Sequence, residues 1–232
     1  MTPLTLICFL LVSLLPPCLT DRWSAETSSA CAINKVQQPV SNQTKVPPAP
    51  PGCETVECQW WEQLRVAAGE VEQSYDQKEK EIAEITRKAP RANNIIGNPP
   101  IMPPDFPDTV ARLDADIQRA ITNFLEQIAK GNKNLFPIPV IDHSTARPIV
   151  IHREKARYTE EARAAKIQGT VLLSLKFQSD GTITDINVIQ GLEGGLNEEA
   201  IIAARKIVFL PAVKNGKFIS GASRAEFQFR LY

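Results

Sequence analysis

Histidine is scarce in this chain, which limits the chemistry that the sequence can support. Only two histidines are present, His143 and His152, and neither has a second ligand at the spacing that helical metal sites use. Ser223 lies in the run GASRA, which lacks the second glycine of a hydrolase nucleophile elbow. The glycines at 191, 194 and 195 precede a predicted helix, but no Lys-Ser or Lys-Thr follows as a phosphate loop requires. We therefore predict a protein that is not an enzyme and that uses no cofactor and no metal.

An excess of positive charge is also missing, and aromatic residues make up only 6% of the chain. The formal net charge is zero, with 26 Lys and Arg against 26 Asp and Glu. A protein that holds a phosphate backbone needs clustered cations, and one that holds single strands needs aromatic stacking platforms. The composition therefore predicts no nucleic-acid partner.

Long apolar runs are absent except for one near the start, from position 4 to position 15. Pro16 and Pro17 follow it and cannot continue a helix. The run is short for a spanning helix and has the length of a signal-peptide apolar region, although the first five residues include no Lys or Arg. We predict that residues 1–20 are a signal peptide or an uncleaved N-terminal anchor. Both alternatives place the rest of the chain outside the cytoplasm.

Five cysteines are present, and Cys8 and Cys18 lie in this targeting segment. Cys53 and Cys58 bracket a short stretch at the start of a predicted helix, so one turn could bring them to disulfide distance. Because an exported protein meets an oxidising compartment, we predict a Cys53–Cys58 disulfide, and the pairing of Cys31 stays open. A zinc site is disfavoured because the cysteine spacings match no zinc pattern.

Two proline-containing stretches read as linkers. Residues 21–53 contain the run VPPAPP, a composition that favours extended polyproline II structure over packing. Residues 132–150 lead from the last predicted helix of the N-terminal half to the C-terminal segment. We expect both stretches to space structured parts of the chain apart.

Residues 54–131 carry two helical patterns, over Glu54–Lys88 and Asp105–Lys130. In each pattern apolar residues recur every three or four positions, and Gly131 is expected to end the second helix. Stripes of this kind pack on each other more often than they form a ligand groove. We therefore predict an antiparallel helical hairpin.

The C-terminal segment, 151–232, has the patterns of a small sheet. Residues Gly169–Gln178 alternate apolar and polar side chains, as a half-buried strand does. Asp180-Gly181 follows, and we expect both residues to take positive φ in a tight hairpin turn that pairs Thr182–Gln190 with the first strand.

A helix and a last strand complete this segment. Asn197 is the predicted N-cap of a helix whose apolar stripe includes Ile207 and Val208 and which ends at Pro211. After a turn at 214–216, Ala225–Tyr232 alternates again and forms an edge with nothing after it to cover it. With a short helix at 160–166, the predicted fold class is α+β: a small antiparallel sheet packed with two helices and preceded by a helical hairpin.

Four runs of the C-terminal segment resemble a known family. The runs YTEEARAAKIQGTVLLSLKF, DGTITDINVIQG, LNEEAIIAARKIVFLPAVKNGK and AEFQFRL are similar to the C-terminal domain of TonB energy transducers. The matching residues, in order and approximate spacing, are Tyr158, Gly169, Asp180, Gly181, Leu196, Asn197, Ala200, Ala203, Pro211, Ala212 and Gly216. The resemblance covers about a third of the chain.

The resemblance implies mechanical work through binding in the periplasm. In this family an extended segment of an outer-membrane receptor adds along the last strand, next to the loop before the first helix, here 153–157, and force from inner-membrane proton-driven motor proteins supports transmembrane transport. The partner-binding residues implied here are Arg224, Ala225, Glu226, Phe227, Gln228, Phe229, Arg230, Lys155, Arg157 and Tyr158. Independently of the resemblance, a domain of this size is only marginally stable alone, so we expect an added strand or a strand-paired homodimer to stabilise it.

The chain also departs from the family pattern, and the departures favour an alternative. It lacks a basic leader and a His-bearing spanning helix, and its Pro-rich spacer is short. The alternative is an exported periplasmic interaction or scaffold protein that uses a TonB-like domain without energy coupling.

Overall fold

The computed structural model describes residues 44–52, 54–91, 99–134 and 147–231. The predicted signal peptide or anchor, Cys31, Cys53 and His143 lie outside the described residues. Gln38–Tyr232 forms one compact unit, so the helical region and the C-terminal segment share it.

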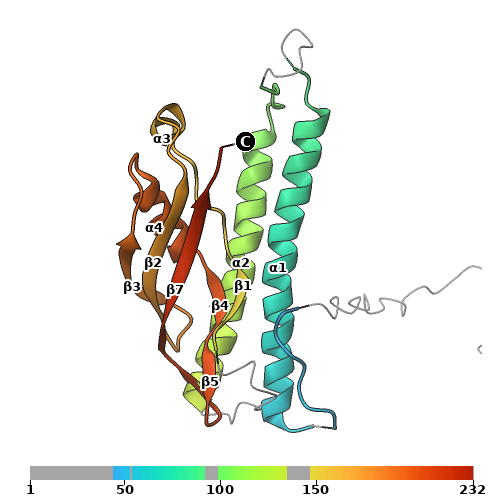
Figure 1. Cartoon of the computed structure of the whole chain (residues 1–232). Coiled ribbons are helices and arrows are strands. Elements are labelled where there is room, and N and C mark those ends of the chain that lie inside the picture. Colours follow the sequence, from blue (N-terminus) through green and yellow to red (C-terminus); the bar gives the residue numbers. More distant parts are fainter. Residues whose placement is uncertain (1–43, 53, 92–98, 135–146, 232) are drawn as a thin grey trace, which may run out of the picture. The chain divides into compact units, whose positions relative to one another are not determined.

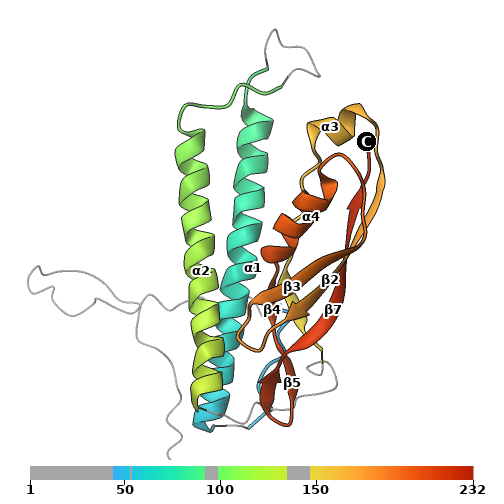
Figure 2. The same ribbon diagram turned by 90° about the vertical axis from the view of Figure 1, so that its left-hand side faces the viewer.

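The predicted helical hairpin is present. Helix α1 spans Val56–Lys88 and α2 spans Phe106–Asn134, and the two helices lie side by side and antiparallel (Figure 1 and Figure 2). Their apolar stripes meet in a core where Trp61, Leu64 and Phe124 are fully buried. Burial of each such side chain contributes roughly 1.5–3 kcal/mol, so packing of the stripes stabilises the pair more than helix propensity does.

Gly131 lies inside α2, so the prediction that it ends this helix is wrong. The residue is covered by the indole of Trp60, and a Cβ at position 131 would lie 2.2 Å from Trp60 Cζ2. A glycine here lets the ring rest on the helix backbone, and α2 continues to Asn134.

The described part of the Pro-rich stretch, 44–52, packs on α1 instead of extending away from it. Val46 is buried in the helical core, and the Trp61 Nε1–H group donates to the Pro47 carbonyl at 2.9 Å. The Ala49 amide donates to the Glu62 carboxylate at 2.7 Å. Proline composition favoured an extended spacer, but the tryptophan and glutamate of α1 supply partners that the composition does not reveal.

The C-terminal segment contains one three-stranded antiparallel sheet of order β3-β2-β7 and two ribbons, β1–β4 and β5–β6. The α+β prediction is therefore confirmed. The elements are β1 Ile149–His152, α3 Glu160–Ala164, β2 Gly169–Phe177, β3 Ile183–Gln190, α4 Leu196–Arg205, β4 Val208–Leu210, β5 Ala212–Lys214, β6 Lys217–Ile219 and β7 Gly221–Phe229.

The β2–β3 hairpin forms as predicted, but with another turn. Only Gly181 has a positive φ, of 88°, and Asp180 does not. The Asp180 carboxylate accepts from the amide and the hydroxyl of Thr182, and these bonds lower its pKa. A longer loop with one left-handed glycine thus replaces the tight two-residue turn. The turn at 214–216 does have positive φ at Asn215 and Gly216.

Two predictions about α4 are wrong. Its N-cap is Gly195 in the left-handed conformation, and the Asn197 side chain instead accepts from the Leu192 amide at 2.9 Å. The helix ends at Arg205, and residues 208–210 form β4, which pairs with β1. All three residues of β4 are buried, which suits a strand with cores on both faces better than a one-sided helix.

The β1–β4 ribbon lies between two hydrophobic cores. Ile151, Val208 and Leu210 belong to the core formed with α1 and α2. Phe209 belongs to the second core, formed by β2, β7, α3 and α4, and Val150 packs against it. The ribbon therefore joins the helical hairpin to the sheet (Figure 1).

Candidate strand-addition site

β7 is one edge of the three-stranded sheet, and its pairing with β2 is regular. Nine consecutive residue pairs, from Gly169↔Phe229 to Phe177↔Gly221, run without a register shift. The predicted alternation is confirmed, since Ala225, Phe227 and Phe229 are buried. The strand begins earlier than expected, at Gly221, and ends at Phe229 rather than at position 232.

The outer edge of β7 exposes backbone groups of alternate residues. The amide of Leu231, just beyond the strand, donates to the Gln168 side chain at the start of β2, so odd-numbered residues face β2. The Glu226 carbonyl accepts instead from the guanidinium of Arg153. By this alternation the backbone groups of Arg224, Glu226 and Gln228 point away from β2. Within the described parts of the chain, β7 pairs with no strand other than β2.

The loop before α3 lies along this edge and supplies side-chain contacts. Besides its hydrogen bond to β7, Arg153 places its guanidinium carbon 4.7 Å from the centroid of the buried Phe227 ring. The predicted contact loop, 153–157, includes this residue, but the predicted partner-binding residues did not, and its hydrogen-bond partner lies 73 residues away in the sequence. Lys155 and Arg157, which were in the set, are exposed.

The Tyr158 side chain mainly packs within the domain. Its ring packs edge-on against Phe229 with the centroids 5.8 Å apart, and its hydroxyl donates to the Ile167 carbonyl. The side chain is half-buried, so only part of it is free to meet a partner.

The opposite edge, β3, is irregular. Its register with β2 shifts twice, and Asp185 has a φ of 53° at one of the two places. Val188 and Ile189 are 39% and 52% exposed along it. Because bulges twist an edge away from an incoming strand, β3 is a poorer template for strand addition than β7.

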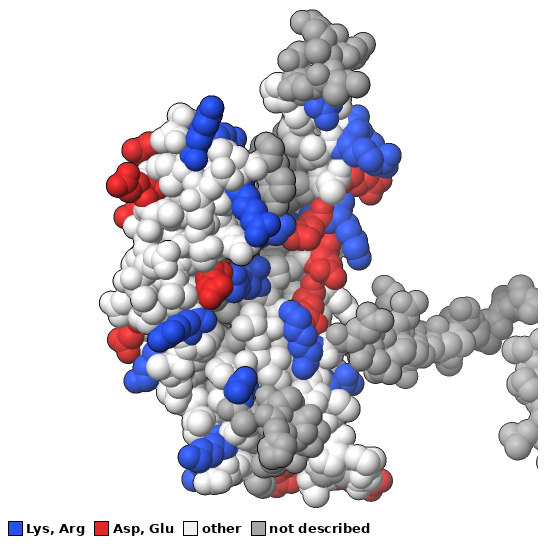
Figure 3. Space-filling model, in the orientation of Figure 1, with Lys and Arg blue, Asp and Glu red and all other residues white. Residues whose placement is uncertain are grey.

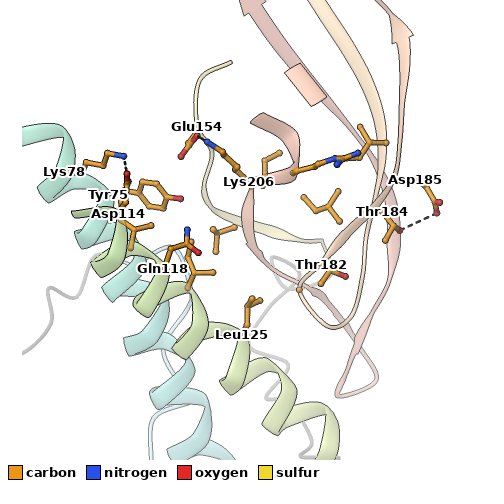
Figure 4. A pocket seen from close by; sticks show the side chains of 18 residues that line it. Tyr75, Lys78, Asp114, Gln118, Leu125, Glu154, Thr182, Thr184, Asp185 and Lys206 are labelled. Atoms are coloured by element: carbon orange, nitrogen blue, oxygen red, sulfur yellow. Dashed lines mark hydrogen bonds and ion pairs between the residues drawn. The ribbon is translucent and has the colours of Figure 1, made fainter. Parts of the chain in front are cut away.

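A hollow of about 900 Å³ lies between α1, α2, the β2–β3 hairpin and the end of α4 (Figure 4). Lys78 forms an ion pair with Asp114 across the helices, and Lys206 forms one with Glu154 at 2.9 Å. These two ion pairs neutralise four of the charged side chains that line the hollow.

Other site types are not supported where the structure is described. Within these residues, no group of three or more His, Cys, Asp or Glu side chains is placed to hold a metal ion. No helix in the same ranges combines the length and hydropathy of a membrane span. Cys58 is disulfide-bonded, while its predicted partner Cys53 lies outside the described ranges.

Comparison with known proteins identifies the C-terminal segment. Residues 154–231 match the model of the family described as Gram-negative bacterial TonB protein C-terminal. Among curated proteins no sequence matches the chain.

Solved structures that match include the NMR structure of the Helicobacter pylori TonB C-terminal domain. That match has 26% identity and a TM-score of 0.28, and it covers 33% of this chain and 70% of the other. The NMR structure of the Pseudomonas aeruginosa TonB C-terminal domain matches with 26% identity and a TM-score of 0.33, over 37% of this chain and 88% of the other.

Residues 154–231 are therefore a TonB C-terminal domain segment, as the sequence resemblance indicated. The match to this family supports a TonB-like energy transducer domain.

Proposed function

We propose that this chain binds an extended segment of an outer-membrane receptor in the periplasm and acts as a TonB-like energy transducer that supports transmembrane transport. The receptor segment adds to the outer edge of β7 as a further strand. In this proposal the chain is exported or held at the inner membrane by its N-terminal segment.

The observation that carries the proposal is the contrast between the two edges of the sheet. β7 pairs regularly with β2, and its outward Glu226 carbonyl accepts from the Arg153 side chain, whereas the register of β3 with β2 shifts twice. An added strand gains affinity from backbone hydrogen bonds and tolerates varied side chains. Such tolerance suits a domain that meets more than one receptor.

The proposal is tested by isothermal titration of the purified full-length chain with receptor-plug peptides. Binding in the micromolar range or tighter is the expected result. If no such peptide binds, an outer-membrane receptor is not the partner and the proposal is wrong. Isotope-edited amide spectra of the complex would show whether the perturbed amides belong to the outward-facing residues of β7.

A scaffold without energy coupling is the second candidate, and one observation favours it. Residues 44–52 pack on α1, so this part of the Pro-rich stretch does not act as an extended spacer while it is docked. Mass spectrometry of the mature N-terminus, together with membrane fractionation, separates the candidates. A chain cleaved near position 20 and found free in the periplasm supports the scaffold, because an inner-membrane motor would have no anchor to act on.

A further inference from the structure

Residues 44–52, here called the strap, lie along α1 and run in the opposite direction to the helix (Figure 1). Near the C-terminal end of the strap, the Ala49 amide donates to the Glu62 carboxylate at 2.7 Å. Near its N-terminal end, the Lys45 ammonium lies 3.8 Å from the Glu72 carboxylate, ten residues later in the helix. A pull on the chain before position 44 therefore reaches the Lys45 contacts first.

The first contact of the strap also reaches the β1–β4 ribbon. The Lys45 ammonium donates to the Ile151 carbonyl at 2.6 Å, although the two residues are 106 positions apart. The register of β1 with β4 shifts between Val150 and His152, so Ile151 has no partner residue in β4. Because such a bulge leaves backbone groups unpaired, the lysine supplies the missing partner. The strap thus connects the helical hairpin to the ribbon.

Few contacts hold the strap in place. Val46 is the only one of its nine residues that is buried. The Lys45 side chain is 55% exposed. Figure 3 shows Lys and Arg beside Asp and Glu along this exposed face of α1, and exposed ion pairs contribute little in water. The helical hairpin, by contrast, has a core in which residues of α1 and α2 such as Leu64 and Phe124 pack together. Loss of the strap leaves that core closed.

We propose that the strap is released by tension: a pull on the chain before position 44 detaches it from α1, beginning at Lys45, before the helices or the sheet unfold. Because the strap is antiparallel to α1, the pull loads its contacts one after another, and each contact breaks singly. When the pull stops, the strap rebinds, since its partners on α1 stay tethered to it at high effective concentration. This inference goes beyond receptor binding and does not depend on strand addition at β7.

Release lengthens the link between the chain before position 44 and α1. The docked strap follows α1 from Val56 to near Glu72, a distance of roughly 24 Å at 1.5 Å per residue. Residues 44–55 span roughly 42 Å when they are fully extended. The expected gain is therefore about 2 nm.

Optical tweezers test the inference on the full-length chain, with a DNA handle at each terminus and no receptor peptide. We expect a reversible step of about 2 nm at a force below that of the main unfolding events. A reducing buffer opens the disulfide of Cys58, which would carry the load past the strap if its partner preceded position 44. A handle attached at Lys80 on α1 instead of at the N-terminus bypasses the strap, and the step should then be absent.

Variants assign the step to the strap, because residues 1–43 lie in the same load path. Val46→Asp puts a charge into a buried site and should abolish the step, while the force of the later unfolding events stays the same. Lys45→Met removes the bond to the Ile151 carbonyl and should raise the opening rate at a given force about fivefold. Lys80→Met removes the same charge from an exposed position of α1 and should leave the rate unchanged.

The outcomes decide the inference separately from the proposed function. A step that persists in Val46→Asp would arise outside the strap and would overturn the inference. A lower force for the later events in this variant would also overturn it, because the strap would then be an integral part of the fold. If circular dichroism shows that Val46→Asp is unfolded, Lys45→Met decides, and an unchanged opening rate in it counts against release from Lys45. Failure of receptor peptides to bind would leave the tension result standing.

Discussion

The rings of Tyr75 on α1 and His152 on β1 stack with their centroids 3.4 Å apart and their planes 6° from parallel. This contact joins the helical hairpin to the ribbon that carries the chain into the TonB C-terminal segment. Burial raises the pKa of Tyr75 to about 12, ahead of the effect of the Glu154 and Asp114 carboxylates. The phenol therefore stays neutral at physiological pH.

The same contact predicts a pH dependence of stability. Burial lowers the pKa of His152 and outweighs the carboxylates of Glu154, Glu79 and Asp76, which raise it. The folded state thus binds fewer protons than the unfolded state as pH falls below about 6.5, so the stabilisation is complete above that pH and is lost below it. We therefore expect a smaller free energy of unfolding at the lower pH.

Urea unfolding at about pH 7.5 and about pH 5.5 measures this difference. His152→Phe keeps a stacked ring without a titrating group and should flatten the difference between the two pH values. An unchanged profile in this variant would show that another group causes the dependence.

Gly131→Ala should destabilise the helical hairpin. The new Cβ would lie 2.2 Å from the Trp60 ring, and the resulting overpacking outweighs the better helix propensity of alanine. We expect a loss of about 1–3 kcal/mol in the free energy of unfolding. Lys130→Ala, at the exposed neighbouring position, serves as the control and should change it by less than about 0.5 kcal/mol.

Gln228→Pro should abolish peptide binding at β7. Proline removes a backbone donor that points away from β2, and the sheet itself does not use that donor. Gln228→Ala keeps the donor and should bind normally in the same titration. Circular dichroism must show the same fold for both variants; a folded proline variant with full affinity would place the peptide elsewhere.

Trp61→Phe should release the 44–52 stretch from α1. The variant loses the hydrogen bond from Nε1 to the Pro47 carbonyl and part of the buried ring, which together stabilise the docked stretch by about 1–3 kcal/mol. Limited proteolysis should then cut within 44–52 faster than in the unchanged chain. Equal rates would mean that Val46 and the Glu62 contact hold the stretch without the indole.

Lys214→Ala at the end of β5 is expected to leave both stability and peptide binding within about 0.5 kcal/mol of the original, because the side chain is exposed and is not among the proposed partner-binding residues. Thermal unfolding and the titration described above measure the two quantities. A larger effect on binding would extend the partner contact to this ribbon.

Local patterns were enough for the elements whose residues interact with near neighbours. The alternation of β2 and β7 and the stripes of α1 and α2 were predicted because one buried face imposes a period of two or of about 3.6 residues. The same alternation along β7 was enough to choose Gln228 as the position for the proline substitution. The resemblance of 154–231 to the TonB C-terminal family rested on ordered turn and cap residues of this local kind.

Distant contacts decided the rest. Residues 208–210 continue a helical stripe in sequence, yet they form β4 because β1 and two cores surround them. Gly131 is typical of a helix end, yet the indole of Trp60 covers it inside α2. Arg147 and Arg153 lie about 75 residues before Arg224 in the sequence, yet all three line one groove beside β7. The zero net charge of the chain does not predict this local cluster of cations. Sequence periodicity thus settled which segments become helices and strands, since that depends on local spacing. Tertiary packing settled where some of them end and what chemistry lines the free edge, since both depend on residues that meet only after folding.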